Sequence, residues 1–295
     1  MWLHVLVLAP LRSFVQSKVR RYRPLIICLT RSNMPLNPEI SRFIREHLDD
    51  NPDQLLWKKN EYPDDRVVVA VEQIQARENI KEKLPSWYAC QNIFYPSKLS
   101  TEQCSSETTA PYKARLTTGN SLCDLTGGLG VDTYFFSRQV DKVTYVERDK
   151  SYCEAARFNF LALGATNIEV IHADATTVAN QVIADTYYID PARRTTDNKR
   201  VFALTDYAPN VLEIKETLLR QGQRLIIKIS PMADLSAVLQ LLSETTDVHV
   251  VSVRNECKEL LFVLGKKRTS QAVNIHTVNF ATDTEQYFSF LLEEE

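Results

Sequence analysis

The sequence predicts an α/β fold, in which helices cover a mostly parallel sheet and a helical N-terminal domain precedes it. Short apolar runs alternate with helical patterns from about residue 121 onward, and parallel strands need crossover helices of this kind. A loop with three of the seven glycines, Gly127, Gly128 and Gly130, joins the first apolar run to a helix. A strand, a glycine turn and a helix form a cradle whose backbone can approach a ligand closely.

Composition is that of an ordinary soluble globular protein. The 295 residues are 44% hydrophobic and 24% charged, enough for one well-buried domain and a smaller appendage. The net charge of -2 provides no overall basic field, so any contact with nucleic acid needs a local patch. The six cysteines are scattered without metal-ligand spacing, which is typical of reduced thiols in a cytoplasmic protein. We therefore expect no disulfide, no metal and no membrane contact; the sequence does not indicate an oligomeric state.

Residues 1–33 differ from the rest of the chain, since they hold six basic residues and no acidic one. The apolar run Trp2–Pro10 is too short to span a bilayer, and the basic residues follow it, whereas in a signal peptide they precede it. Our hypothesis is that these residues are an extension upstream of a mis-assigned start, and that the folded protein begins at Met34.

Residues 34–116 are predicted to form the helical N-terminal domain, with helices at 40–49, 54–59 and 67–84. The first is amphipathic, with Ile40, Phe43, Ile44 and Leu48 on one face. The third is expected to stop at Pro85, because proline cannot continue a helix.

The polar run Leu99–Arg115 leads into the first strand and has two interpretations. One is a solvated helix with Ser100 and Gln103 as a capping box. The other is a segment that closes over a ligand through four polar side chains: Ser105, Ser106, Glu107 and Lys113.

The sheet domain is expected to span residues 117–267. Its predicted strands are 121–125, 143–147, 168–172, 186–190 and 224–229, followed by an antiparallel pair, 248–253 and 260–264, parted by polar residues 254–259. The predicted helices between them are 131–139, 152–163 with its end at Gly164, and one that carries Tyr207, Val211, Ile214 and Leu218 on one face. Residues 268–295 are expected to be the start of a truncated C-terminal region.

Two acidic residues indicate which ligand the glycine loop binds. Asp124 ends the first strand, where it would repel a pyrophosphate but suits a ligand with a sulfonium, an ammonium and a ribose diol, as S-adenosylmethionine has. Glu147 ends the second strand twenty residues after Gly127, in the place of an acid that binds both ribose hydroxyls. Thr133 stands where a dinucleotide fingerprint has a third glycine, which disfavours a nicotinamide oxidoreductase. This ordered set resembles the class I S-adenosylmethionine-dependent methyltransferases, which have a Rossmann-like sheet with a reversed last strand.

Ligands of such sheets bind beyond the carboxyl ends of the strands. The resemblance implies that Asp174 and Ala175, after the third strand, contact the adenine. The candidate cofactor-binding residues are Asp124, Thr126, Gly127, Gly128, Gly130, Thr133, Glu147, Arg148, Asp174 and Ala175.

The segment Asp190-Pro-Ala-Arg-Arg194 follows the fourth strand and holds the candidate catalytic residues, Asp190 and Arg193. Its proline fixes the turn, Asp190 can accept a proton or a hydrogen bond, and Arg193 can bind a phosphate or a carboxylate in bidentate fashion. The structural alternative is that Asp190 caps a turn and pairs with Arg193.

Four segments together narrow the resemblance: 102–113, 124–133, 190–194 and 227–232. They are similar to the bacterial predicted RNA methyltransferases with a THUMP-like C-terminal domain, which implies S-adenosylmethionine as the methyl donor and RNA as the substrate. Amino-methyltransferases of similar pattern carry an aromatic residue where this chain has Ala192-Arg193, which puts methylation of an exocyclic amine in doubt. The C-terminal domain of the family would begin near Ala272.

The residues also limit the chemistry. Methylation at uracil C5 needs a cysteine nucleophile, and similar uridine enzymes place it after the fifth strand, where this chain has Ser230-Pro-Met232. Direct in-line methyl transfer remains, in which the protein aligns the acceptor and supplies a hydrogen-bond acceptor or a base. The alternative from another class is a non-catalytic RNA-binding or scaffold protein that keeps the fold.

Overall fold

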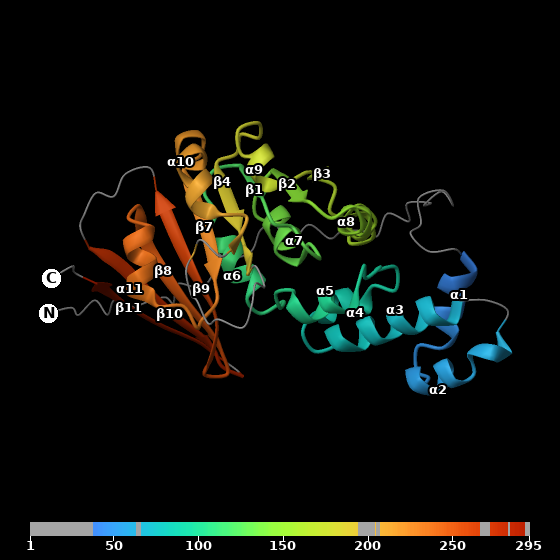
Figure 1. Cartoon of the computed structure of the whole chain (residues 1–295). Helices are drawn as coiled ribbons and strands as arrows, with labels where there is room; N and C mark the ends of the chain where they lie inside the picture. Colours follow the sequence, from blue (N-terminus) through green and yellow to red (C-terminus); the bar gives the residue numbers. More distant parts are fainter. Residues whose placement is uncertain are drawn as a thin grey trace, which may run out of the picture.

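The computed structural model of the protein describes residues 38–62, 66–193, 204, 207–265, 272–282 and 284–292. A nine-stranded sheet forms one part of the molecule, and the N-terminal helices gather beside it (Figure 1). The hypothesis about residues 1–33 lies outside the described residues.

The nine strands run in the order β11-β10-β8-β9-β7-β4-β1-β2-β3. Their bounds are β1 Ser121–Asp124, β2 Lys142–Glu147, β3 Ile168–His172, β4 Thr186–Ile189, β7 Arg224–Ile229, β8 Thr245–Val253, β9 Glu256–Gly265, β10 Val273–Phe280 and β11 Glu285–Leu292. From β3 to β7 all neighbours are parallel, whereas β9 is antiparallel to both β7 and β8. The predicted mostly parallel sheet with a reversed last strand is therefore confirmed, and all seven predicted strands are present.

Two further strands extend the sheet beyond the predicted set. β10 lies parallel to β8, and β11 lies antiparallel to β10. Both strands come from residues 268–295, which the sequence assigned to a separate C-terminal region. The turn between β8 and β9 is only Arg254 and Asn255, both with positive φ (51° and 63°), so β9 begins within the polar segment that was expected to part the strands.

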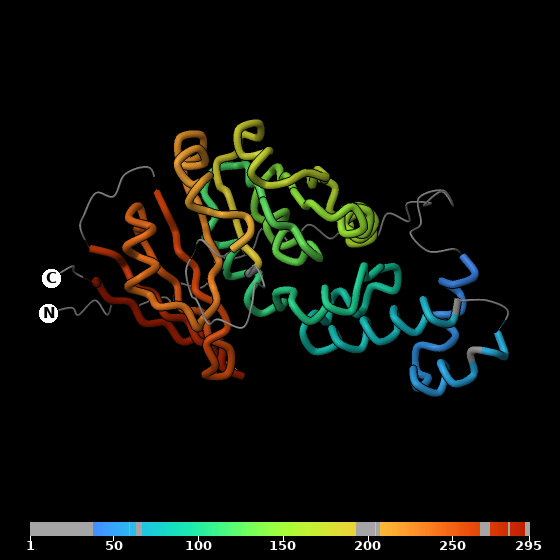
Figure 2. Tube along the Cα trace, viewed as in Figure 1, coloured from blue at the N-terminus to red at the C-terminus, as the bar shows by residue number. Residues whose placement is uncertain are grey.

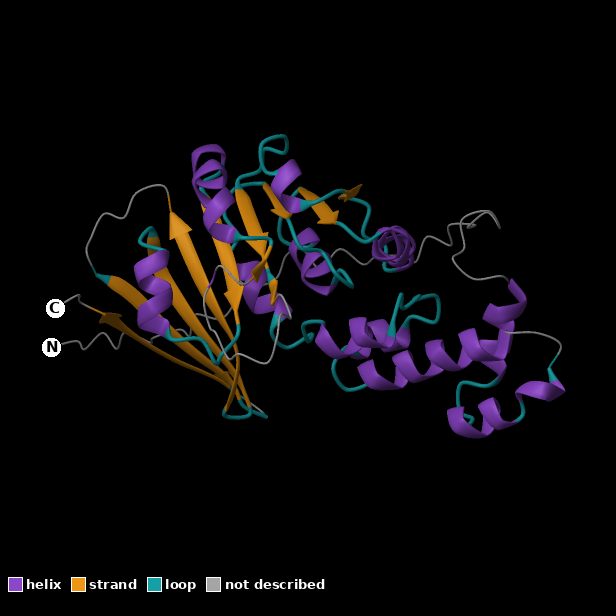
Figure 3. Ribbon diagram, in the orientation of Figure 1, coloured by secondary structure: helices purple, strands orange, loops and turns teal. Residues whose placement is uncertain are grey.

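Helices cover both faces of the sheet, as Figure 3 shows. Those that follow the glycine loop are α7 Val131–Ser137, α8 Lys150–Ala162, α9 Ala175–Val178, α10 Val211–Gln221 and α11 Leu235–Leu241. One core, which holds Cys123 and Ile227, contains α9, α10 and α11. The opposite core, which holds Leu122 and Ile226, contains α7 and the short helix α6 (Ala110–Arg115). Alternate residues of each strand thus enter different cores, as the pleat of a buried sheet requires.

One helix begins later than its apolar pattern predicts. Tyr207 lies in the two-residue strand β6 (Tyr207–Ala208), which pairs with β5 (Ala192–Arg193), and not in a helix with Val211. Asn210 is the N-cap of α10, and its side chain accepts a hydrogen bond from Leu212 N at 3.2 Å. The cap fixes the start of the helix despite the earlier apolar residue.

The remaining N-terminal helices are α1 Pro38–Glu46, α2 Pro52–Trp57, α3 Arg66–Ile80, α4 Pro85–Ala89 and α5 Lys98–Gln103, with the 3₁₀ turn η2 at Lys59–Glu61. Their path from α1 to α5 can be followed along the tube in Figure 2. The third predicted helix is shorter than expected. α3 ends at Ile80, so Pro85 does not stop it, and Pro85 instead occupies the first turn of α4, where a missing amide hydrogen has no cost.

The predicted helix at Leu99–Arg115 is wrong in extent, since α5 and α6 are separate helices. The expected capping box at Ser100 and Gln103 is also wrong. The N-cap of α5 is Ser97, whose hydroxyl accepts a hydrogen bond from Ser100 N at 3.1 Å. A serine three residues upstream satisfies the same rule, and the sequence alone does not distinguish the two.

The N-terminal helices pack directly on the glycine loop. Trp87 is fully buried in a core that also holds Leu129 of the loop and Val131 of α7. On α8, the Asn159 side chain bonds to both the amide and the carbonyl of Phe94, each at 2.8 Å. These contacts position the loop between the helical domain and the sheet.

Among the described residues, no helix is long and apolar enough to cross a membrane. The same residues contain no group of three or more His, Cys, Asp and Glu side chains arranged to hold a metal ion.

Candidate functional site

The loops that follow β1, β2 and β4 are joined by direct hydrogen bonds. Glu147 Oε2, at the end of β2, accepts a hydrogen bond from Gly128 N at 3.0 Å. The Thr126 hydroxyl accepts one from Asp190 N at 2.7 Å. Four of the predicted site residues, two in the glycine loop and one at the end of each neighbouring strand, therefore meet at one edge of the sheet.

The three glycines of the loop are needed for different reasons. A Cβ on Gly127 would lie 2.1 Å from Cε2 of Tyr145, and one on Gly130, whose φ is 90°, would lie 2.7 Å from Cζ of Phe160. Those two glycines let aromatic rings pack against the loop. Gly128 has a φ of 52°, and a Cβ there would lie 3.9 Å from its nearest neighbour, the carbonyl oxygen of Thr126. Of these three glycines, only Gly128 has no side chain packed against its Cβ position.

Asp124 lies beneath the loop, with 1% of its surface exposed. Its Oδ1 accepts a hydrogen bond from Thr126 N at 3.1 Å, and its Oδ2 accepts one from the Thr133 hydroxyl at 2.5 Å. From its place at the end of the first strand, this carboxylate was expected to face a ligand. In the structure both oxygens bind donors of the loop and of α7, so Asp124 holds the loop in shape.

The predicted residues after β2 and β3 lie next to each other. Ala173 N donates a hydrogen bond to Glu147 O at 3.0 Å, and His172 Nε2 lies 3.0 Å from Arg148 O. Asp174 is exposed, and its Oδ1 accepts a hydrogen bond from Thr176 N at 2.9 Å, so it caps α9, whose first residue is the buried Ala175.

Asp190 is paired with a lysine that the sequence analysis did not assign to the site. Its Oδ2 lies 2.6 Å from Lys228 Nζ, and Lys228 also lies 3.8 Å from Glu259 Oε2. Burial by itself would lower the pKa of Lys228, but the carboxylates of Asp190 and Glu259 outweigh it and raise that pKa. Lys228 is therefore a fixed positive charge beside Asp190. Arg193 belongs to β5, and its side chain lies outside the described part of the structure.

Lys113 is the centre of a buried charge cluster beneath this edge. Its side chain is completely buried, with Nζ 2.7 Å from Ser105 Oγ, 2.9 Å from Glu259 Oε2 and 3.0 Å from Asp132 Oδ1. Burial opposes ionisation of Asp132, but Lys113 and Lys228 outweigh it and lower the pKa of that carboxyl. Glu259 contacts both lysines, so the cluster connects α6 to the residue after β4.

Three members of this cluster, Asp132, Lys228 and Glu259, were missed by the sequence analysis. Lys228 carried a signal, because it interrupts the otherwise apolar strand 225–229, and a lysine there is seldom buried without a partner. Nothing in the sequence indicated that Asp132 and Glu259 are buried. Asp132 lies in the first turn of a predicted helix and Glu259 in a polar segment, and acidic residues in both places are usually solvated.

The polar run before β1 fits neither of its two interpretations. The Glu107 carboxylate accepts hydrogen bonds from Ser86 N at 2.8 Å and Trp87 N at 3.3 Å, so it caps α4. Ser106 bonds within its own turn, to Thr109. Lys113 and Ser105 belong to the buried cluster. The run therefore joins the helical domain to the sheet.

Replacing Lys113 by methionine should destabilise the fold strongly, because two buried carboxylates lose their main counter-charge. We expect a loss of about 3–5 kcal/mol in the free energy of unfolding, measured by urea denaturation. The control is Arg115→Met on the same helix, which removes an exposed ion pair with Glu285 and a cation–π contact with Tyr112, and should cost less than the Lys113 variant, about 1 kcal/mol. Equal losses in the two variants would contradict a central role for the cluster.

Asp124 should make stability depend on pH. Burial raises its pKa to about 7, although hydrogen bonds from Thr133 and Thr126 act in the opposite direction. The folded protein thus binds this proton more tightly than the unfolded chain, and its contribution to the free energy of unfolding declines from about pH 4 to about pH 7. Between pH 5 and pH 8 the wild type should lose about 3 kcal/mol relative to Asp124→Asn, which cannot titrate. Urea denaturation at both pH values tests this, and a constant difference would refute it.

The structure is similar to a solved structure described as a "putative methyltransferase from Porphyromonas gingivalis W83". The TM-score is 0.76 at 31% sequence identity, over 85% of this chain and 64% of that protein. This chain therefore spans less than two thirds of the length of that relative. No protein-family model matches the sequence, and no curated protein does.

Two further likenesses cover 55% of this chain. An rRNA methylase from Streptococcus thermophilus has a TM-score of 0.40 and 19% identity over 96% of its length. A "putative methyltransferase" from Streptococcus mutans, solved in complex with SAH, has a TM-score of 0.41 and 18% identity over 97% of its length. From the Porphyromonas likeness and the strand order, the chain has the Rossmann-like sheet of class I methyltransferases, with an N-terminal helical domain.

Proposed function

We propose that the protein is an S-adenosylmethionine-dependent methyltransferase that acts on RNA by direct in-line transfer. The observation that carries the proposal is the bonded edge of the sheet, where Glu147 contacts the glycine loop at Gly128 and Thr126 contacts Asp190. The glycine loop, proposed to bind the methyl donor, and Asp190, proposed to contact the methyl acceptor, are thereby held side by side. The 31% identity to the Porphyromonas protein supports the same reaction class.

The residues of this edge fit the proposed donor. No side chain packs against Gly128, so a ligand can approach the backbone there. The half-buried Glu147 carboxylate accepts hydrogen bonds from the Gly128 and Asp149 amides, and its remaining lone pairs can bind hydroxyl groups. Asp174, exposed at the start of α9 and near Arg148, is available to an adenine amino group. When bound, S-adenosylmethionine supplies a methyl group that its sulfonium already activates.

Asp190 is the residue proposed to orient the acceptor. Its side chain is 37% exposed and Lys228 holds its Oδ2, while no described residue donates a hydrogen bond to its Oδ1. That oxygen can accept a hydrogen bond or a proton from an acceptor group, in a position set by the ion pair. Arg193, two residues beyond Pro191, is proposed to bind a phosphate of the RNA.

The direct test is turnover. The purified protein is incubated with S-adenosylmethionine labelled on the methyl group, and with total RNA, DNA and protein fractions in separate reactions. We expect label in the RNA fraction only. Label in another fraction would replace RNA as the substrate, and binding of the donor without label in any fraction would favour the scaffold alternative.

Glu147→Ala should weaken binding of S-adenosylmethionine, because it removes a carboxylate partner of the ribose hydroxyls. The expected loss is about 1.5–3 kcal/mol, measured by isothermal titration calorimetry. Glu169→Ala on the neighbouring strand β3 is the control, since that glutamate is exposed and pairs with Lys142. Unchanged affinity in Glu147→Ala would mean that the donor binds elsewhere.

Asp190→Asn should keep the shape of the acceptor motif and remove its charge. We expect methyl transfer to fall about 10²–10⁴-fold in single-turnover assays, the usual contribution of a positioned acid or base, with little change in donor affinity. Asp234→Asn, at the N-cap of α11, is a control outside the site and should transfer methyl at the wild-type rate. A wild-type rate in Asp190→Asn would leave this carboxylate without a chemical role.

A further inference from the structure

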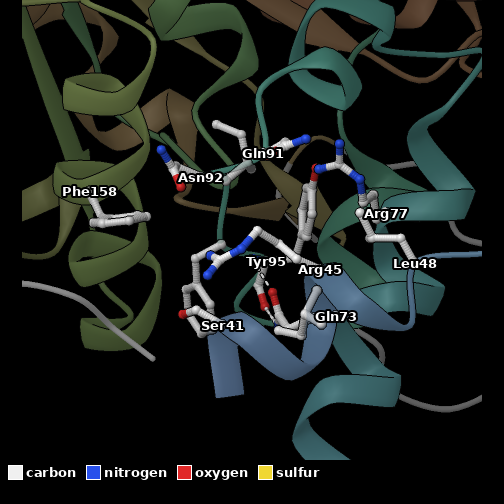
Figure 4. A pocket seen from close by; sticks show the side chains of 12 residues that line it. Ser41, Arg45, Leu48, Gln73, Arg77, Gln91, Asn92, Tyr95 and Phe158 are labelled. Carbon is white, nitrogen blue, oxygen red and sulfur yellow. Dashed lines mark hydrogen bonds between the residues drawn. The ribbon is translucent and has the colours of Figure 1, made fainter. Parts of the chain in front are cut away.

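The cavity where the N-terminal helices meet α8 is too small for a nucleotide. Side chains from α1, α3, the segment 91–95 and α8 line it (Figure 4). Its volume is about 40 Å³, which is room for a few water molecules, and both Tyr95 and Phe158 on its walls are buried. The ion pair at the carboxyl edge of the sheet, in contrast, includes a group that the proposed function uses, Asp190.

Lys228 lies beside Asp190 because of the register of two neighbouring strands. β4 and β7 are parallel, and Ile189 pairs with Ile227. The residues that follow this pair are Asp190 and Lys228, so the two side chains leave the same face of the sheet at its carboxyl edge. Asp190 Oδ2 and Lys228 Nζ accordingly lie 2.6 Å apart.

An ammonium group is costly to bury at this place. The Lys228 side chain is only 15% exposed, and apolar side chains often stabilise such a place as well as a buried ion pair does. The buried carboxylates do not account for a second lysine, because Lys113 already contacts both Asp132, at 3.0 Å, and Glu259, at 2.9 Å. Lys228 lies 3.8 Å from Glu259 but 2.6 Å from Asp190, so Asp190 is its principal partner.

The ion pair holds Asp190 at a second point. The Thr126 hydroxyl binds its backbone amide at 2.7 Å, Lys228 binds its Oδ2, and no described residue donates a hydrogen bond to its Oδ1. A carboxylate held at two points keeps its free oxygen in one direction, which lowers the cost of orienting it toward an acceptor. Burial opposes the charge of Lys228, but the carboxylates of Asp190 and Glu259 raise its pKa, so the ammonium stays charged.

We propose that Lys228 is a positioning residue for methyl transfer, which acts through Asp190 by holding its Oδ2 so that Oδ1 faces the methyl acceptor. The role rests on the proposed function, because it concerns the same acceptor group. Glu259 contacts Lys228 from the neighbouring strand β9 and so connects the buried cluster to the acceptor carboxylate.

The first test is a double-mutant cycle of single-turnover methyl transfer to the fraction that accepts the label. Lys228→Met removes the ammonium and keeps an unbranched side chain. We expect transfer to fall about 10²-fold, as for a group displaced by about 1 Å, while the affinity for S-adenosylmethionine in calorimetry stays the same. The double variant Lys228→Met/Asp190→Asn should transfer within about threefold of Asp190→Asn, because a residue that acts only through Asp190 has no effect without that carboxylate.

Lys215→Met is the matched control. Lys215 Nζ lies 2.7 Å from Glu244 Oε2, and these side chains are 13% and 30% exposed, close to the 15% and 37% of Lys228 and Asp190. Glu244 directly precedes β8, whose first residue pairs with the end of β9, as the first residue of β7 does. The control pair therefore lies near the opposite edge of the sheet, and its loss should lower stability and leave methyl transfer at the wild-type rate.

A second cycle needs no turnover. Urea denaturation of the donor-free protein compares the same two substitutions, singly and together. Lys228→Met leaves the Asp190 carboxylate without its ammonium, so the double variant should have a higher urea midpoint than Lys228→Met alone. If Lys228→Met does not fold, the comparison of the double variant with Asp190→Asn in the transfer assay still decides the proposal.

The proposal is overturned if Lys228→Met transfers methyl at the wild-type rate, if the losses of the single variants multiply in the double variant, or if the substitutions are additive in urea. A wild type that transfers no methyl to any fraction would refute the proposed function and the positioning role with it. An active wild type in which the two substitutions act independently would refute only the role of Lys228.

Discussion

The buried ammonium of Lys113 is the group on which the other parts of the structure depend. It lies within 3.0 Å of Asp132, at the start of α7, and of Glu259, on β9. A buried charge is tolerated only when its partners are in place. Removing one partner of a buried ion pair costs far more stability than replacing the whole pair by apolar side chains. This one side chain therefore links the position of α6 on the sheet to the start of α7 and to the register of the reversed strand, β9. The Tyr188 hydroxyl, which donates to Asp132 Oδ2 at 2.9 Å, adds β4 to the same set.

The cluster also reaches the proposed chemistry, because Glu259 contacts Lys228 and Lys228 holds Asp190. The carboxylate after β4 is thus oriented from beneath by a neighbouring strand, in addition to its own loop. Two lysines, 113 and 228, face three carboxylates, 132, 190 and 259, which leaves one negative charge in excess. An excess negative charge at this edge suits a positively charged donor.

The N-terminal helices contribute to the site indirectly. They bury Trp87 against Leu129 and Val131, so the glycine loop is packed from the outside while Asp124 bonds to it from beneath. A loop held from both sides keeps its amides in a fixed direction, which lowers the cost of ordering them around a ligand.

The sequence by itself located the seven core strands, because apolar runs alternate with crossover helices. Their order in the sheet followed from the resemblance to class I methyltransferases, since periodicity does not show strand order. The sequence also located the glycine loop, Glu147 and Asp190, since ligand sites in such sheets follow the strand ends. Only the tertiary structure decided which way Asp124 faces, because the pattern of apolar and polar residues does not show whether a carboxylate bonds to its own loop or to a ligand. It likewise decided that Lys113, Lys228 and Glu259, from distant parts of the chain, share one buried cluster. Periodicity reports which residues are buried, but the partners of a buried charge are set only when the strands are placed side by side.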